Sequence, residues 1–247
     1  MGLGMMALLL AVMVGTSLLS GIFGMAGGLV LVGVLLVLMP LPDAMALHAV
    51  TQVASNAWRA AFLLRHVRWR IAGAYALGCI LATAGWSLFL WVPDKPLALI
   101  ALGISPFLLK LLPAAAKPDA ARPSHGTACG IASMSLMLLT GVSGPLTDAF
   151  FLGGRMERHA IVATKAVCQM QAHLLKLLYF GAMVADPGQL DPLLAGGAVL
   201  ASMLGTVLAR KILDALTEAQ FRRWAGRIVT AIAVTYIAHG SWLLVMT

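Results

Sequence analysis

Two glycine-interrupted apolar stretches, at matching places in the two halves of the chain, constrain its fold more than any other feature. The first runs from Ser20 to Gly28 and the second from Thr140 to Pro145. Both lie within long hydrophobic stretches, yet they carry too much glycine to continue a helix comfortably. Unwound backbone inside a membrane is tolerated only where it is buried in protein or lines a cavity. Paired interruptions of this kind therefore indicate a solute-binding site.

The composition places the chain in a membrane. Hydrophobic residues form 61% of its 247 residues and charged residues only 11%, whereas a soluble domain carries about 25% charged residues. Apolar stretches recur along the whole chain, which predicts one transmembrane domain over 1–247. No Lys or Arg precedes the first apolar run, so a cleaved signal peptide is not expected. The three cysteines lie in apolar stretches without metal-ligand spacing, so we expect no disulfide, metal or other cofactor.

Hydropathy and loop residues divide each half into five helical segments. These run over 5–22, 28–39, 43–65, 70–91 and 96–112 in the first half, and over 126–141, 145–153, 157–182, 190–209 and 220–244 in the second. This division predicts repeat one (1–112), a cytoplasmic linker (113–124) and repeat two (125–247). The second segment of each repeat is too short to cross the hydrocarbon core, which needs about 20 helical residues. Each repeat is therefore expected to open with a glycine-broken, re-entrant-type hairpin.

The basic residues predict how the repeats are oriented, because short cytoplasmic loops are rich in Lys and Arg. The loop after the third segment holds Arg65, Arg68 and Arg70, whereas its counterpart over 185–191 has acids and no bases. In the loop after the fourth segment the difference is reversed, because there the second repeat holds more basic residues than the first. Most of the 17 Lys and Arg residues are cytoplasmic if the repeats are inverted and both termini lie outside. We thus expect an all-α polytopic protein with two inverted repeats, in a membrane of the bacterial inner-membrane type. The net charge of +8 then reflects topology, and no nucleic-acid partner is expected.

The third segment of each repeat carries a polar stripe. Gln52, Asn56 and Arg59 share one helix face in the first repeat, and Lys165 and Gln169 occupy the places of Gln52 and Asn56 in the second. Such a stripe is too costly to face lipid, so it must face protein or a cavity. Lys165 lies roughly 15 Å into its segment at 1.5 Å per residue, close to the middle of the membrane. An ionisable group at that depth predicts a functional site.

The hairpins explain how this site could hold an anion. The second arm of each hairpin is expected to begin as a helix at its tip, near Gly27 and at Pro145, since Pro favours the first helical position. Two helix N-termini would then direct free N–H groups and positive dipole ends to the midplane. The expected substrate-binding residues are Gly24, Gly27, Gly28, Gln52, Asn56, Gly141, Ser143, Gly144, Lys165 and Gln169.

Several charged side chains have two interpretations. Asp148 lies about one turn past the second tip, where it could carry a coupled proton or act as a structural partner of Lys165. Arg59 and Lys176 could bind the ligand or extend toward opposite membrane surfaces. His48 lies near a loop and is expected to take no part.

Short motifs in both halves resemble one known family. They are Gly24-x-x-Gly27-Gly28, Pro40 after the first hairpin, Ala49-x-Thr51, Gly141-x-Ser143-Gly144 and Ala163-Thr164-Lys165. Together they are similar to the TauE/SafE family of sulfite and sulfonate exporters, over essentially the whole chain. The second hairpin departs from the family pattern, since it continues with Pro145-Leu146-Thr147-Asp148 instead of further glycines. The resemblance implies a secondary transporter, not an enzyme, that exports sulfite, an organosulfonate or a related anion with proton coupling.

Two other functions fit parts of the sequence. A passive anion channel would use the same site without proton dependence. The string Gly141-Val142-Ser143-Gly144, together with His239, resembles the Ser–His dyad of rhomboid intramembrane proteases. However, His239 is expected near the outer end of its helix and Ser143 near the midplane. The sequence leaves open which anion, which direction and which coupling ion apply, and whether the protein is a homodimer.

Overall fold

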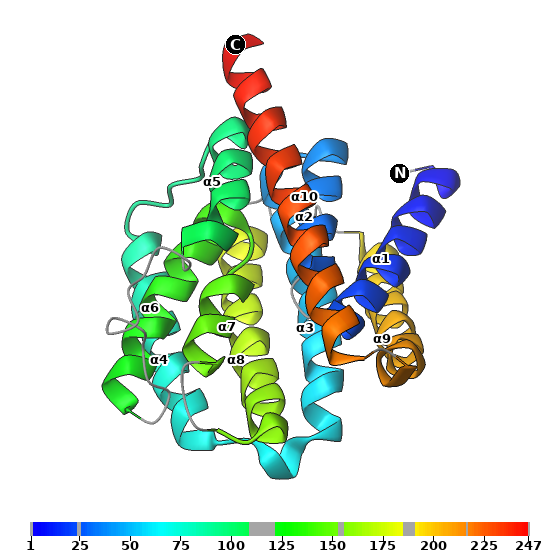
Figure 1. Ribbon diagram of the computed structural model, residues 1–247. Coiled ribbons are helices and arrows are strands. Elements are labelled where there is room, and N and C mark those ends of the chain that lie inside the picture. Colours follow the sequence, from blue (N-terminus) through cyan, green and yellow to red (C-terminus); the bar gives the residue numbers. More distant parts are fainter. Residues whose placement is uncertain are drawn as a thin grey trace.

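The computed structural model describes residues 2–23, 26–108, 122–152, 156–184, 191–215 and 217–246, and all regular structure in these ranges is helical. The first half forms α1 (Leu3–Phe23), α2 (Ala26–Leu38), α3 (Leu41–Phe62), the 3-10 turn η1 (Leu64–His66), α4 (Trp69–Ser87) and α5 (Lys95–Leu108). The second half forms α6 (Pro123–Thr140), α7 (Gly144–Leu152), α8 (Arg158–Leu178), the π-helical segment η4 (Tyr179–Val184), α9 (Pro192–Ala215) and α10 (Glu218–Met246) (Figure 1). The expected all-α fold is confirmed, and each expected segment overlaps one α-helix. Gly24 and most of the expected linker 113–124 lie outside the described residues.

The distribution of polar side chains is that of a membrane protein. Leu88 and Phe89 are each 80% exposed, whereas His48 and Lys176 are fully buried. Among the described residues, three segments are long and apolar enough to span a bilayer: Leu3–Phe23, Pro192–Ala209 and Gly226–Met246. The helices α3 and α8, with 22 and 21 residues, have comparable length, but their polar stripes lower their hydropathy. Their polar groups can lie in a membrane because neighbouring helices cover them.

The two halves are interleaved. Helix α4 of the first half packs against α6 of the second half. The counterpart of α4 in the second half is α9, and it packs against α1, the counterpart of α6 in the first half. The third helices, α3 and α8, pack against each other, as do the fifth helices, α5 and α10. Each of these contacts joins one half to the other, and the pattern is unchanged when the halves are exchanged. Neither half therefore forms a separate folding unit.

Glycines allow the two outer helix pairs to approach closely. A Cβ on Gly205 of α9 would collide with the carbonyl oxygen of Val14 on α1, and a Cβ on Gly78 of α4 would collide with that of Thr127 on α6. Because backbone atoms cannot move aside as a flexible side chain can, both positions require glycine. Close packing at small residues is the usual way in which membrane helices associate.

The central helices α3 and α8 run antiparallel. His48, two turns into α3, contacts Lys176 near the end of α8, and the backbone N–H of Arg68 after α3 donates a 2.9 Å hydrogen bond to Thr164 Oγ1 near the start of α8. Figure 1 shows the two helices side by side with opposite chain directions. Equivalent helices that run in opposite directions are what inverted repeats require. The inversion of the whole repeats in a membrane stays a prediction.

The second helix of each half is short. The helices α2 and α7 have 13 and 9 residues, hence lengths of about 20 Å and about 14 Å at 1.5 Å per residue. The hydrocarbon core is about 30 Å thick, so neither helix can cross it. Between α6 and α7 the chain reverses at Gly141, whose φ of +85° is the left-handed conformation typical of a helix C-terminus. The tip of the second hairpin thus lies at 141–143; its re-entry into a membrane stays a prediction.

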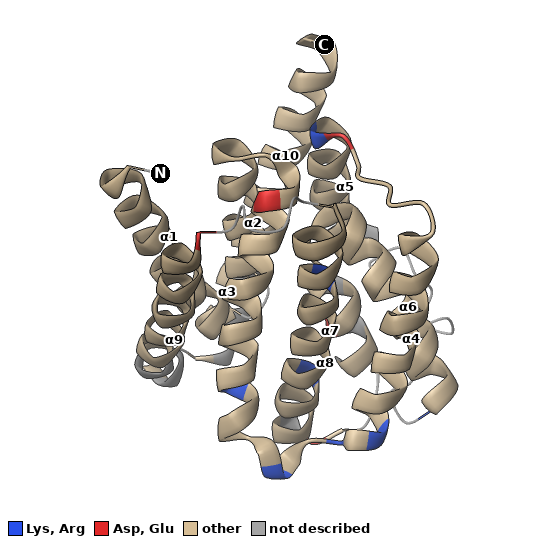
Figure 2. Ribbon diagram, turned by 180° about the vertical axis from the view of Figure 1, so that it is seen from behind, with Lys and Arg blue, Asp and Glu red and all other residues tan. Residues whose placement is uncertain are grey.

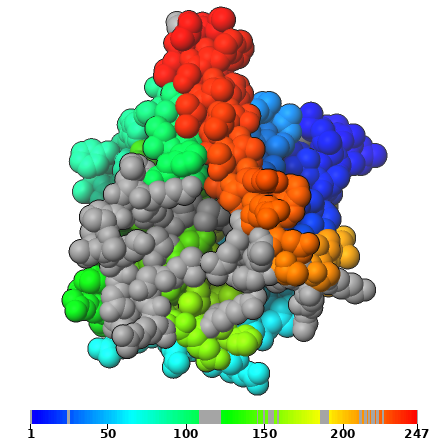
Figure 3. Space-filling model, viewed as in Figure 1, coloured from blue at the N-terminus to red at the C-terminus, as the bar shows by residue number. Residues whose placement is uncertain are grey.

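Basic residues gather at one end of the molecule. Figure 2 shows most of the coloured Lys and Arg residues at the end where α3 joins α4, whereas both chain termini lie toward the other end. The space-filling view shows the end of α10 projecting beyond the rest of the protein, with Val245 83% exposed (Figure 3). This charge asymmetry is the one that the inverted topology predicts, with the basic end in the cytoplasm.

Candidate functional site

The tip of the second hairpin is held against α8 by an amide side chain. Gln169 Nε2 donates a 2.8 Å hydrogen bond to Thr147 Oγ1 and a longer one, 3.4 Å, to Ser143 Oγ. Ser143 and Thr147 are fully buried and Gln169 is 7% exposed. The structure thus brings Gln169 and Ser143, two of the residues expected to bind substrate, into direct contact.

The start of α2 faces α3. A Cβ on Gly28 would lie 3.5 Å from the Gln52 side-chain amide, and the carbonyl oxygen of Gly28 accepts a 3.0 Å hydrogen bond from His48 Nε2. Gly27 faces the other way, because a Cβ there would collide with the carbonyl oxygen of Thr16 on α1. Of the two glycines, Gly28 therefore adjoins the polar stripe of α3, and Gly27 packs against α1.

A buried lysine links the two hairpins. Lys176 Nζ lies 2.9 Å from the carbonyl oxygen of Gly141 and 2.8 Å from His48 Nδ1. A carbonyl oxygen only accepts, so His48 Nε2 carries the proton donated to Gly28, and Nδ1 of the neutral ring accepts from Lys176. One continuous chain of hydrogen bonds thus runs from Gly28 in the first hairpin to Gly141 at the tip of the second.

The structure excludes one of the two interpretations of Lys176 and corrects the expectation for His48. Lys176 does not extend to a membrane surface but is fully buried, and His48 lies inside α3 and forms two buried hydrogen bonds. A signal was available for both residues. His48 lies four residues before Gln52, and Lys176 lies seven residues after Gln169, so each continues a polar stripe by whole turns.

A second charged cluster lies on α8, three turns before Lys176. Lys165 Nζ forms an ion pair with Asp148 Oδ1, as the sequence suggested, and the two side chains are 19% and 23% exposed. Arg59, from the end of α3, is close enough to Asp148 to interact electrostatically. The charge of Lys165 is therefore already compensated by a carboxylate. A role of Lys165 in anion binding and of Asp148 in proton coupling stays a prediction.

The remaining residues of the expected site are buried close by. Asn56 is 5% exposed, and its amide donates a 2.9 Å hydrogen bond to the carbonyl oxygen of Gln52, one turn earlier in α3. Gly144 is buried and begins α7. Gly144 thus opens the second arm of the second hairpin, and Asn56 lies one turn from Gln52, whose side chain adjoins Gly28. Ligand binding by either residue stays a prediction.

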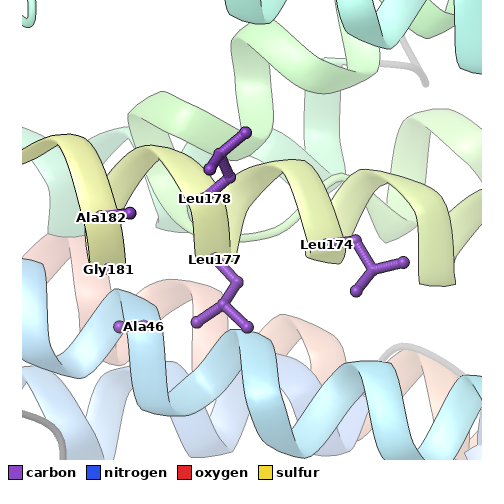
Figure 4. Close-up of a pocket in the computed structure, with 6 residues that line it drawn as sticks. All are labelled: Ala46, Leu174, Leu177, Leu178, Gly181 and Ala182. Carbon is purple, nitrogen blue, oxygen red and sulfur yellow. The ribbon is translucent and has the colours of Figure 1, made fainter.

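An apolar pocket of about 360 Å³ lies between α3 and the end of α8 with η4 (Figure 4). It is lined by Ala46, Leu174, Leu177, Leu178, Gly181 and Ala182. Leu174 and Leu178 are 46% and 51% exposed, so the pocket opens on the apolar outer surface. None of the polar residues described above lines it, and its walls offer no group that would bind an anion.

The proposed Ser–His pair of a protease is not formed. Ser143 Oγ is bonded by Gln169, and the ring of His239 contacts Trp242 on its own helix, with ring centroids 6.2 Å apart. No hydrogen bond joins Ser143 to His239 in the described part of the chain. A nucleophilic serine needs its base within hydrogen-bond reach, so this geometry does not support proteolysis.

Comparison with known families gives one match. The family model described as Sulfite exporter TauE/SafE matches residues 8–236. The chain belongs to this family. The match spans both hairpins and both polar helices, and it confirms the resemblance seen in the motifs. Since this is a family of transporters, membership agrees with a transport function. Searches of the curated proteins and of the solved structures give no significant match.

Proposed function

We propose that this protein is a secondary transporter that exports a small sulfur-containing or carboxylate anion, such as sulfite or an organosulfonate. The observation that carries the proposal is the meeting of both hairpins at the α3–α8 pair, joined by the hydrogen bonds of Lys176 and His48. Two interrupted segments that converge on buried polar groups form the type of site that transporters use. Membership of the TauE/SafE family supports the anion class.

Alternating access is the mechanism that this arrangement favours. The helix contacts are unchanged when the two halves are exchanged, and α3 and α8 run antiparallel. In an inverted-repeat transporter the two repeats exchange conformations, and the exchange opens a central site first to one side and then to the other. The charge asymmetry supports a topology with both termini outside. The hairpin residues and the stripe residues Gln52, Asn56, Lys165 and Gln169 would surround the transported anion.

Asp148 is the candidate for proton coupling. It is a partly buried carboxylate at the second hairpin and is paired with Lys165. Protonation of Asp148 would release Lys165, and the resulting change of charge would couple a proton to movement of the hairpin. A structural ion pair would leave transport independent of the proton gradient.

Counterflow in proteoliposomes tests the function. Vesicles containing the purified protein are loaded with unlabelled sulfite and diluted into a trace of radiolabelled sulfite. A carrier exchanges one anion for the other, so the label accumulates transiently above its outside concentration. A passive channel would equilibrate the label without such accumulation, and vesicles without protein provide the background. Absence of label uptake with sulfite, sulfoacetate and acetate alike would contradict the proposal.

A further inference from the structure

A protonated Lys176 would have no carboxylate among the described residues to compensate its charge. Its side chain is fully buried, and within the described residues the ion pairs of Asp and Glu are those of Asp148 with Lys165 and Glu157 with His159. A buried ammonium without a counter-charge is costly in a protein interior and especially within a membrane. This position therefore favours an anion.

When it is protonated, Lys176 has one donor that no described residue uses. An ammonium group has three N–H donors, and the acceptors in the described part of the protein are Gly141 O and His48 Nδ1. Both ring nitrogens of His48 already form hydrogen bonds, because Nε2 donates to Gly28 and Nδ1 accepts from Lys176. One donor of Lys176 thus remains for a ligand.

A second buried group at the same place also has no partner. His173, one turn before Lys176 on α8, is 3% exposed, and its Nδ1 atom is buried without a hydrogen-bond partner among the described residues. Its ring meets the edge of the His48 ring, with centroids 5.4 Å apart, and it lies within electrostatic reach of Lys176. Buried ring nitrogens are normally hydrogen-bonded, so an unpaired one beside a lysine indicates a ligand contact.

We infer that Lys176 and His173 bind the charged head of the transported anion, between the two hairpins. A sulfite, sulfonate or carboxylate head has several oxygens and can accept from both side chains at once. Lys165, which the sequence favoured for this role, is instead occupied by Asp148. This inference rests on the proposed transport function and specifies which cation serves it.

Binding at Lys176 would also connect the ligand to both hairpins. The same ammonium donates to Gly141 and, through His48, is linked to Gly28. An anion that attracts Lys176 changes the hydrogen bonds that link Gly28 of the first hairpin to Gly141 of the second. Occupancy of the site and the position of the hairpins are then coupled by one side chain.

Thermal unfolding in detergent, measured over a series of sulfite concentrations, tests the inference, because a ligand of the folded state raises the unfolding temperature by mass action. The variants are Lys176→Met and His173→Phe, with His159→Phe as the control at an exposed histidine. His173→Phe keeps an aromatic ring and removes no hydrogen bond of Nδ1 within the described protein. It is therefore informative even where Lys176→Met fails to fold.

We expect Lys176→Met to abolish the sulfite response and His173→Phe to raise the half-saturating concentration at least about tenfold, since a hydrogen bond to a charged ligand is lost. His159→Phe should keep the response of the wild type. If the wild type responds but His173→Phe and Lys176→Met respond equally well, the inference is wrong while the transport proposal stands. If the wild type responds to no anion, the proposed function fails and the inference with it.

Discussion

Lys176 Nζ and His48 Nδ1 lie 2.8 Å apart although 128 residues separate them in the chain. The contact joins the end of α8 to the third turn of α3 and, through the carbonyl oxygens of Gly28 and Gly141, reaches both hairpins. In the proposed mechanism the hairpins move relative to each other during transport. Through the Lys176–His48 contact, binding of the charged ligand would then affect the position of both hairpins.

Replacing Gly141 should destabilise the second hairpin. Its φ of +85° is unfavourable for any residue with a Cβ, and a Cβ there would lie 2.8 Å from both Met45 Sδ and Val32 Cγ2. We expect Gly141→Ala to cost about 2 kcal/mol or more in the free energy of unfolding, seen as a lower unfolding temperature in detergent. Gly196→Ala is the control, because a Cβ at that exposed helical position meets nothing within 4 Å. Equal unfolding temperatures for both variants would contradict the hairpin geometry.

Asp148→Asn should separate proton coupling from a structural ion pair. If Asp148 carries the coupled proton, the variant keeps sulfite counterflow but no longer responds to an imposed pH gradient. Asp43→Asn, in the first turn of α3, should respond as the wild type does. A normal response to the gradient in Asp148→Asn would assign the carboxylate a purely structural role.

The same pair makes a prediction about stability. Removal of Asp148 leaves Lys165 partly buried and unpaired, so Asp148→Asn should cost about 2 kcal/mol, between the values for exposed and fully buried pairs. The double variant Asp148→Asn, Lys165→Met should recover most of this loss because no unpaired charge remains. If the decrease in unfolding temperature of the double variant equals the sum of the decreases of the two single variants, the two residues do not interact.

Gly33 and Tyr236 should be energetically coupled. The Tyr236 hydroxyl on α10 donates to the carbonyl oxygen of Leu29 on α2, and a Cβ on Gly33 would collide with the Tyr236 ring. Gly33→Ala should therefore lower the unfolding temperature by more than Tyr236→Phe, which loses a hydrogen bond worth about 1 kcal/mol. In the background Tyr236→Leu, Gly33→Ala should cost less because the ring is absent. An unchanged cost in that background would argue against the contact.

Ser143→Ala distinguishes the transporter from the protease. Ser143 accepts a long hydrogen bond from Gln169, which keeps its shorter bond to Thr147 in the variant. We expect counterflow to persist, with a half-saturating sulfite concentration changed by less than about tenfold. Proteolysis would require this hydroxyl as nucleophile, so complete loss of all activity in a folded variant would favour the protease instead.

Cysteine labelling tests the topology. The native Cys79, Cys129 and Cys168 are buried, so their background reaction with a membrane-impermeant maleimide should be low. In intact cells, Asp94→Cys should react and Arg65→Cys should react only after permeabilisation, because the basic loop faces the cytoplasm. The reverse pattern would place both termini inside.

The helices and the tip of the second hairpin could be predicted because local signals define them. Apolar length defines α1, α9 and α10, and glycine at 141 marks where α6 must end. The polar stripes likewise predicted that Gln169 faces the interior. The contact of Lys176 with His48 could not be predicted in the same way, because it depends on α3 and α8 packing antiparallel in one register. Helical periodicity gives the face of a residue and says nothing about which helix lies opposite.

The packing of each half against the other could not be predicted from the sequence either. Gly78 and Gly205 allow close packing in the structure, but composition does not identify α6 and α1 as the partners. The ion pair of Lys165 and Asp148 could be predicted because the two residues lie in consecutive elements, the second hairpin arm and the following helix. In this ion pair Asp148 compensates the charge of Lys165, which the sequence predicted to bind the anion. Only the three-dimensional arrangement shows that Lys176 has no carboxylate partner among the described residues.

Locating a bound sulfonate in the protein tests the central claim most directly. Crystals grown with 2-bromoethanesulfonate allow the bromine to be found from its anomalous signal. The account predicts a single strong site between the two hairpins, with the sulfonate oxygens within hydrogen-bond distance of Lys176 Nζ and His173. A sulfonate bound at Lys165 with Asp148 displaced, or found only in the apolar pocket beside Leu174 and Leu178, would contradict it.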